Sequence, residues 1–330
     1  METTASASTC HFVPVFPYRP DMVKKRPQLP QGPRGFPGLP EDWLAEFETY
    51  KSEDGEANLF AHLYRNTRDD NEVAHRALVV LHGQGEHSGR YVHWPHYLHS
   101  KVGSIYAPDH RGHGQSSGAR GHISHFDLYA HDAARAIRRY DAYLKASVGR
   151  SEIHLVGHSM GGLIAMRTML LHPDLPVKSV ALSAPMIQLA FQLPKIKELA
   201  SRLALAIAPN IPLPTEPLAH LVSRDPAVVE HYKADKLNHG LASAAFFYSY
   251  LTVKADTLGR GGDFKVPMQM MLPLADRIIE PQATQDFFAT LPGSQNKLLV
   301  YPQLFHEIFN EPEKEQIFTD LRFWIKSHAG

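Results

Sequence analysis

A serine between two glycines is the first feature of the sequence that could do chemistry. The segment Gly157-His158-Ser159-Met160-Gly161 follows the apolar run "EIHLV" and precedes the helical run "GGLIAMRTMLLH". These flanks predict a strand that turns sharply into a helix, with the serine at the turn. Glycines are needed because side chains at such a tight turn would collide, and the serine itself is held in a strained conformation. The segment therefore predicts an elbow that presents a nucleophile.

A nucleophilic serine also needs a base and a carboxylate behind the base, and in this architecture they follow it in the order acid, then histidine. The chain has 21 histidines, so position decides among them. His306 follows the last strand-like run, "NKLLVYPQ", and Asp276 ends the one before it, "VPMQMMLPLAD". A carboxylate that accepts the imidazole N–H fixes the tautomer and stabilises the imidazolium. We expect Ser159, Asp276 and His306 to form a catalytic triad.

Other residues compete for these roles. Asp263 precedes the strand that Asp276 ends, Glu280 lies further into the loop, and a salt bridge to Arg277 would give Asp276 a purely structural role. Five other histidines follow the serine, but their positions predict that they lie in the helices or in an inserted segment: His172, His220, His231, His239 and His328.

Negative charge that develops on a substrate carbonyl oxygen needs hydrogen-bond donors. In this architecture one donor is the N–H of the residue after the nucleophile, and the other comes from the loop after an early strand. These positions correspond to Met160 and to Gln84 in the loop "LHGQGEHSGRY" (81–91). A backbone N–H serves whatever its side chain is, so the Gln84 amide group need not take part.

Two histidine-rich stretches could suggest metal or phosphate binding. His93, His96 and His99 recur every third residue, but no acid or cysteine accompanies them and Pro95 starts a helix, which predicts a surface face. The loop "APDHRGHGQSSGARGH" (107–122) lacks the Gly-Lys-Ser/Thr of a phosphate-binding loop, so we expect it to pack near the site. No metal site and no cofactor is predicted.

Composition restricts the class of protein. Lys plus Arg and Asp plus Glu both number 34, which argues against a nucleic-acid binder because such proteins present a basic surface. The single cysteine, Cys10, forms neither an intrachain disulfide nor a cysteine-based metal site. The N-terminus resembles no secretory signal, and no run of 18 apolar residues occurs. We expect a cytoplasmic protein whose membrane contact, where present, is peripheral; the sequence makes no prediction of oligomeric state.

Strand-like and helical runs alternate along most of the chain, which predicts an α/β fold with a mostly parallel central sheet and helices on both faces. This alternation stops at 186–260, where no buried strand is expected and the runs are helical. The segment is therefore predicted to form a cap or lid over the carboxyl edge of the sheet. The core is thus expected at 41–185 and 261–330. Residues 1–40 are proline-rich and form either a disordered tail or a wrapping arm.

Taken together, five motifs resemble the monoacylglycerol lipase and lysophospholipase family of serine α/β-hydrolases: "LHGQGEHSGRY", "PDHRGHGQSSGARGHI", "GHSMGGLIA", "ADKLNHG" and "FHEIFNEP". The resemblance extends from about residue 45 to the C-terminus. It implies an α/β-hydrolase fold, the triad and backbone donors named above, and a small lipid substrate such as a monoacylglycerol or a lysophospholipid, with the cap burying the acyl chain and contacting a membrane. The chain departs from the family at Gln84, where better-known members carry a small residue.

The same triad would also serve a broad carboxylesterase, a thioesterase or an acyltransferase. A non-catalytic ligand receptor on a hydrolase fold is a different class of protein, and the intact serine, aspartate and histidine argue against it. The motifs leave the head group, the acyl-chain preference and the positional preference undetermined.

Overall fold

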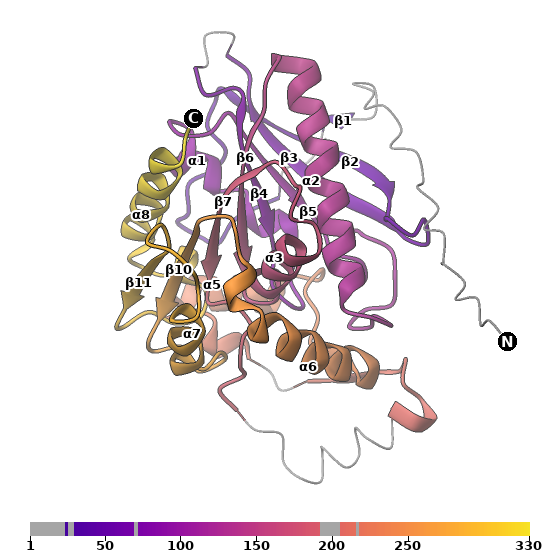
Figure 1. Cartoon of the computed structure of the whole chain (residues 1–330). Coiled ribbons are helices and arrows are strands. Elements are labelled where there is room, and N and C mark those ends of the chain that lie inside the picture. Colours follow the sequence, from indigo (N-terminus) through magenta and orange to yellow (C-terminus); the bar gives the residue numbers. More distant parts are fainter. Residues whose placement is uncertain (1–23, 26–29, 69–71, 192–204, 216–217) are drawn as a thin grey trace, which may run out of the picture.

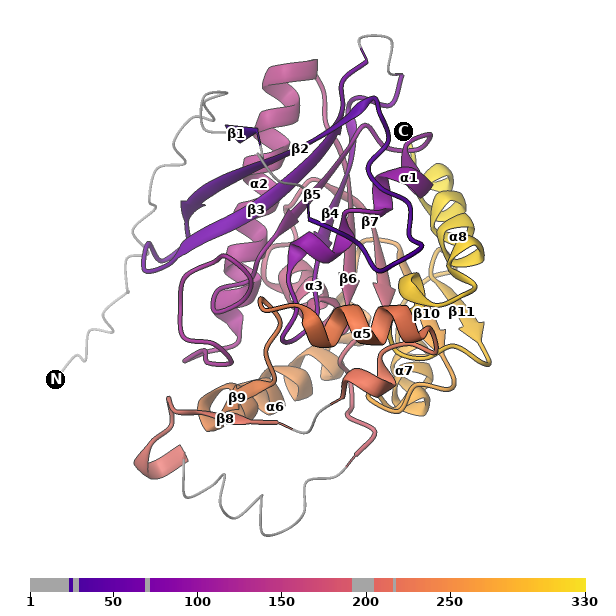
Figure 2. The same ribbon diagram turned by 180° about the vertical axis from the view of Figure 1, so that it is seen from behind.

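The computed structural model describes residues 24–25, 30–68, 72–191, 205–215 and 218–330. A twisted sheet forms the centre of the molecule, helices cover both of its faces, and two helices of the 186–260 segment lie beyond one end of the strands (Figures 1 and 2). This arrangement is the three-layer α/β fold that the alternating runs predict.

In the part of the chain that the structure describes, the central sheet has nine strands in the order β1-β2-β3-β5-β4-β6-β7-β10-β11. The first three strands and β5 pair antiparallel, and the strands from β5 to β11 pair parallel. The strands are β1 (Lys24–Lys25), β2 (Trp43–Lys51), β3 (Asn58–Asn66), β4 (Arg76–Leu81), β5 (Ser104–Pro108), β6 (Glu152–His158), β7 (Val177–Ser183), β10 (Met268–Pro273) and β11 (Lys297–Tyr301). The strands expected from the apolar runs are all present.

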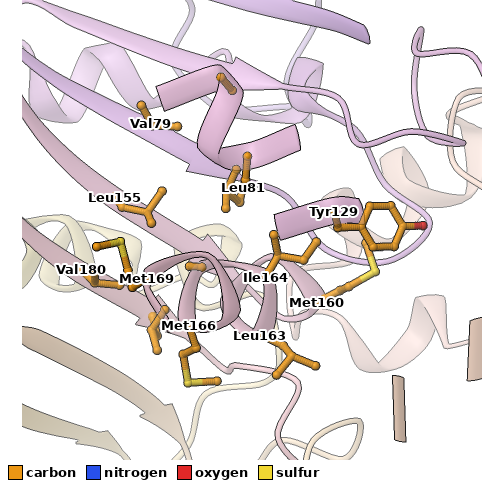
Figure 3. Packing of buried hydrophobic residues seen from close by; sticks show 14 of the residues in the cluster. Val79, Leu81, Tyr129, Leu155, Met160, Leu163, Ile164, Met166, Met169 and Val180 are labelled. Carbon is orange, nitrogen blue, oxygen red and sulfur yellow. The ribbon is translucent and has the colours of Figure 1, made fainter. Parts of the chain in front are cut away.

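Successive residues of the buried strands face opposite layers, because side chains alternate along a strand. Val79 and Leu81 of β4 join a cluster with α2 (Asp127–Val148), α3 (Met160–Leu171), α6 (Ala244–Gly259) and α7 (Pro281–Phe288). Figure 3 shows part of this cluster, where methionines and leucines of α3 meet the strands. Leu78 and Val80 face the other layer, formed by α1 (Trp94–Leu98) and α8 (Lys314–Ser327).

The expectation for 186–260, which we call the cap, needs one correction. The described part contains α5 (Pro226–Ala234), α6 and the 3-10 helix η3 (Ala219–Leu221), but also a short antiparallel pair, β8 (Pro212–Pro214) with β9 (Leu241–Ser243). The cap is therefore not wholly helical. Two prolines in β8 lack the N–H that a helix interior needs, which explains the extended conformation there. Part of the amphipathic stretch 196–214 lies outside the described residues.

Most of the proline-rich segment 1–40 lies outside the described residues, but 30–40 can be followed. The Phe36 ring packs edge-on against His93, with ring centres 5.0 Å apart. The His231 Nε2–H of α5 donates to the Gln31 carbonyl oxygen at 2.9 Å. Arg34 lies 3.7 Å from Glu230 of the same helix. This part of the segment thus lies along the core and reaches the cap.

Candidate active site

Ser159 occupies the turn between β6 and α3, with φ 52° and ψ −117°. A non-glycine residue with positive φ is strained and needs support from its surroundings. Its N–H donates to the Ser183 carbonyl of β7, and its own carbonyl accepts from the N–H of Gly162 and of Met186, each at 2.9 Å. Backbone hydrogen bonds to a neighbouring strand and to α3 therefore hold the strained turn.

The two flanking glycines leave space that the turn requires. A Cβ atom at Gly157 would lie 2.4 Å from the Gly161 carbonyl oxygen, and one at Gly161 would lie 2.0 Å from that of Leu81. Neither distance is compatible with a side chain. His158, between Gly157 and Ser159, ends β6 and is buried, with its Nδ1 3.2 Å from the Ser183 hydroxyl oxygen. Burial lowers the pKa of His158 to about 4.

The structure brings Asp276 and His306 together. Pro273 of β10 pairs with Tyr301 of β11 in parallel register, so the loops that follow these strands leave the sheet side by side. The His306 Nδ1–H donates to the Asp276 carboxylate at 2.7 Å, and the other carboxylate oxygen accepts from the N–H groups of Ile278 and Ile279. This leaves His306 Nε2 as the nitrogen able to accept a proton.

The electrostatics of this pair favour a basic histidine. Burial alone would lower the pKa of His306, but the Asp276 carboxylate outweighs it and the net pKa is raised above its ordinary value. Burial alone would likewise raise the pKa of Asp276, but the imidazole and two backbone N–H donors lower it overall. Asp276 is therefore ionised at neutral pH and stabilises a proton on His306.

The competing residues have other partners. Glu280 caps the first turn of α7 by accepting from the Gln282 N–H, and Asp263 pairs with Arg260 at 2.9 Å. The Asp276 carboxylate faces His306 rather than Arg277. His220 lies in η3, His231 in α5, His239 in the loop before β9, and His172 and His328 end α3 and α8.

The loop after β4 lies against Ser159, where the second donor was expected. A Cβ atom at Gly83 would lie 3.3 Å from the Ser159 Cβ, so the Gly83–Gln84 backbone passes close to the serine. Met160 is the first residue of α3, and its side chain is buried. The N-terminus of a helix carries partial positive charge from its unpaired N–H groups, which favours an anion beside Ser159.

Behind these groups lies a buried ion network that sequence reasoning missed. Arg90 donates to both carboxylate oxygens of Glu307 at 2.7 and 2.8 Å and to Glu86 at 2.6 Å, and Glu86 accepts from the Gly83 N–H at 2.6 Å. Arg90 holds the pKa of Glu307 well below its ordinary value. The network joins the loop beside Ser159 to the residue after His306. The Glu86–Arg90 spacing of four residues is visible in the sequence, but the 217-residue separation of Arg90 from Glu307 hides the second pair.

The cap also contacts the loop that carries His306. The Glu307 N–H donates to the Val222 carbonyl at 2.7 Å. The backbone N–H of Arg224 donates to one carboxylate oxygen of Glu311 at 2.6 Å, and its guanidinium Nε donates to the other at 2.5 Å. Glu311 is fully buried, and nothing in the local sequence indicated that it holds the cap.

The histidine triplet 93, 96 and 99 is only in part the expected surface face. His96 and His99 are exposed, but His93 is buried against Phe36 and Phe318, because its place before α1 turns it toward the core. Within the described ranges no cluster of three or more His, Cys, Asp or Glu residues is arranged to hold a metal ion. The same residues contain no helix with the length and apolar character needed to cross a membrane.

Comparison with known proteins agrees with the α/β-hydrolase fold. Residues 72–313 match the hydrolase family described as serine aminopeptidase, S33. A monoacylglycerol lipase from Mycolicibacterium smegmatis is 31% identical over 259 residues, which cover 77% of this chain and 89% of that protein. The phospholipase YtpA of Bacillus subtilis is 28% identical, with coverage of 74% and 93%. An abhydrolase domain-containing protein of Dictyostelium discoideum is 30% identical, but this chain spans only 26% of its length.

The solved structure of a monoacylglycerol lipase from Paleococcus ferrophilus superimposes with a TM-score of 0.67 at 28% identity, covering 77% of this chain and 95% of that one. The fold and the relatives define an ester hydrolase of the α/β-hydrolase class. Within that class, the chain belongs to the family described as serine aminopeptidase, S33, whose model matches residues 72–313.

Proposed function

We propose that this hydrolase cleaves carboxylic esters of single-chain lipids, with monoacylglycerols as its main substrates, through a covalent acyl-enzyme. The observation that carries the proposal is the strained serine at the β6–α3 turn, whose neighbour His158 has its ring centre 4.8 Å from that of His306, the buried partner of Asp276. The similarity to monoacylglycerol lipases supports the substrate class.

In the first half of the proposed reaction, the Ser159 hydroxyl oxygen attacks the acyl carbonyl while His306 Nε2 takes its proton. Asp276 holds the imidazolium through Nδ1–H. The oxyanion accepts hydrogen bonds from the backbone N–H groups of Gln84 and Met160, each contributing about 3–4 kcal/mol in comparable sites. The ester C–O bond then breaks, and the glycerol leaves with the proton from His306.

In the second half, water attacks the acyl-serine ester. His306 takes a proton from this water and returns it to the Ser159 oxygen, which frees the fatty acid and regenerates the enzyme. The apolar cluster around α3 continues into Leu221, Val222 and Val228 of the cap. This continuity supports a cap that accommodates an acyl chain.

The test is hydrolysis of mono-, di- and triacylglycerols and of lysophospholipids by the wild type and by Ser159→Ala. We expect monoacylglycerols to be cleaved fastest and Ser159→Ala to lose at least about 10⁴-fold in kcat, since the nucleophile is essential. Equal activity of the two proteins would refute the mechanism. Faster cleavage of lysophospholipids would favour the activity named for the relative YtpA.

Chain-length profiling with p-nitrophenyl esters separates a lipid hydrolase from a general esterase. A sharp optimum at acetate would contradict the lipid assignment and leave a carboxylesterase on the same residues. Failure of Ser159 to react with a fluorophosphonate probe would favour a ligand receptor instead.

A further inference from the structure

The Gln84 side chain bridges the core and the cap. Its amide nitrogen Nε2 lies 3.1 Å from the carbonyl oxygen of Leu241, the first residue of β9. Its amide oxygen Oε1 lies 3.1 Å from Nε2 of His113, which belongs to the glycine-rich loop after β5. One side chain thus contacts two segments separated from it by 29 and 157 residues.

The chemistry of the partners fixes the direction of the contact with the cap. A backbone carbonyl only accepts, so the amide group must donate to Leu241 through Nε2, and Oε1 then faces His113. Burial, together with His239 and His110, lowers the pKa of His113 well below its ordinary value, so that imidazole is neutral. Its single N–H is on Nε2 or on Nδ1, so His113 donates either to Gln84 Oε1 or to the Arg111 carbonyl, which lies 3.1 Å from Nδ1. The bond to Leu241 is therefore the one that Gln84 makes without competition.

The backbone around Gln84 touches the cap as well. The His239 N–H donates to the Gly85 carbonyl oxygen at 2.8 Å. Gly85 has a φ of +75°, and a Cβ atom there would lie 2.2 Å from the His239 carbonyl oxygen, so the two backbones are in direct contact. On the neighbouring loop, the Ser243 N–H donates to the Gly121 carbonyl oxygen at 2.8 Å. Residues 239–243 of the cap, which include β9, thus rest on both loops beside the site.

Within the tripeptide 83–85, only Gln84 has a side chain. Hydrogen bonds hold the backbone on both sides of it, since the Gly83 carbonyl accepts from His82 Nδ1–H and the Gly85 carbonyl accepts from the His239 N–H, each at 2.8 Å. Glycine restricts the backbone less than any other residue, so the Gln84 side chain supplies a further restraint on this loop. The bond to Leu241 anchors the residue that follows Gly83, whose backbone lies against Ser159.

We propose that Gln84 is a positioning residue that makes the stabilisation of the oxyanion depend on the seating of β9. This inference rests on the proposed function, in which the Gln84 N–H is one of the two donors. When β9 rests on the loop, the side-chain bond orients that N–H; when β9 lifts away, the donor turns and the transition state loses part of its stabilisation. Binding of the ground-state substrate is little affected, so the effect is on kcat rather than on KM.

The experiment compares Gln84→Met, which keeps the length of the side chain without the amide, with Gln84→Ala and the wild type on a soluble short-chain ester. Gln115→Ala is the matched control, because this glutamine is exposed on the adjacent glycine-rich loop. We expect both Gln84 variants to lose about tenfold in kcat with KM unchanged, since a small misplacement of a catalytic group has effects of this order or larger. We expect the control to match the wild type.

Two further measurements separate positioning from general damage. Asp235→Asn weakens the cap at its 2.8 Å contact with His87 and keeps the hydrogen bond to the Leu237 N–H. It should lower kcat in the wild type but add little in the Gln84→Met background, because both changes release the same segment. Amide hydrogen exchange in residues 239–243 should be faster in Gln84→Met.

The outcomes distinguish the two proposals. If Gln84→Met has the same kcat as the wild type, or if only its KM changes, the positioning role is overturned. The hydrolase assignment would remain intact. A second outcome is that the wild type neither cleaves any ester nor reacts with the fluorophosphonate, while residues 239–243 still exchange faster in Gln84→Met. This outcome would refute the proposed function but support the contact between Gln84 and the cap. Additive effects of Gln84→Met and Asp235→Asn on kcat would also contradict coupling through the cap.

Discussion

Ser159, Asp276 and His306 follow the carboxyl ends of the parallel strands β6, β10 and β11, whereas the cap is held by apolar packing of α6 in the cluster around α3 and by contacts between loops. The three residues are only 6%, 7% and 5% exposed, backbone hydrogen bonds fix the turn at Ser159, and the N–H groups of Ile278 and Ile279 hold the Asp276 carboxylate. The cap is attached through side-chain bonds such as His87–Asp235 and Arg224–Glu311, together with a few backbone bonds between loops.

This difference separates two requirements of catalysis. The reacting groups need fixed geometry, which the sheet provides because the strand register determines where each loop begins. Substrate entry needs a part that can move, and polar contacts between loops are easier to open than a buried sheet. Arg90 joins the two core loops beside Ser159 and His306, and Glu311 links the His306 loop to the cap.

The largest effect should come from the sheet side, in Asp276→Asn. An amide at this position favours the wrong tautomer of His306, and we expect kcat to fall by about 10⁴-fold. The measurement is steady-state hydrolysis of a soluble ester, with thermal unfolding to show that the variant folds. Asp263→Asn is the matched control, because Asp263 is exposed and pairs with Arg260 alone. Loss of less than about tenfold would remove Asp276 from the triad.

The pH dependence tests the same pair. His306 must be neutral to accept a proton, and its pKa is raised, so kcat/KM should fall as pH drops through a value above the ordinary histidine pKa of about 6.5. Stability should change in the opposite sense. A raised pKa contributes to the free energy of unfolding below about pH 6.5, and this contribution disappears as pH rises through the folded pKa.

Profiles of kcat/KM and of the unfolding midpoint from about pH 5 to about pH 9 check both directions. An acid limb at or below the ordinary histidine value would contradict the geometry of the Asp276–His306 pair.

A smaller effect is expected from the link between the cap and the His306 loop. Glu311→Gln removes the charge that pairs with Arg224 inside the protein, and we expect a loss of about 1–3 kcal/mol in the free energy of unfolding and severalfold in kcat. Glu313→Gln is the control, because this carboxylate bonds the same arginine at the exposed surface. Chemical denaturation and ester hydrolysis give the two readouts. Equal losses in the free energy of unfolding for the two substitutions would show that burial of the Arg224–Glu311 pair does not stabilise the attachment of the cap.

The smallest effect on the chemistry should come from the outer surface of the cap. Ile207 and Ile211 are 73% and 58% exposed, and replacing both with serine should leave soluble-ester hydrolysis unchanged but lower the rate on monoacylglycerol in lipid vesicles severalfold. Phe323→Ser is the control, because Phe323 is 61% exposed on α8, outside the cap. Unchanged activity on vesicles would contradict membrane contact through this part of the cap.

Much of the sheet could be predicted from the sequence because each parallel strand is a short apolar run bounded by turn residues. The position of Asp276 and His306 after the last two strands followed from the order of the runs. The 93–99 histidines show where such reasoning fails, since periodicity placed all three at the surface and only the packing of His93 against Phe318 revealed that it is buried. The short strand pair in the cap was missed because β8 and β9 are only three residues each.

The sequence by itself determined the α/β fold class, the turn at Ser159 and the candidates for acid and base, because local runs and glycine spacing encode strands, helices and sharp turns. Only the tertiary structure decided that Asp276 faces His306, that Arg90 joins Glu307, and that Gln84 reaches Leu241. These contacts join residues 30, 217 and 157 positions apart. No local pattern records such pairs, because they form when parallel strands bring their carboxyl ends to one edge of the sheet and the cap closes over it.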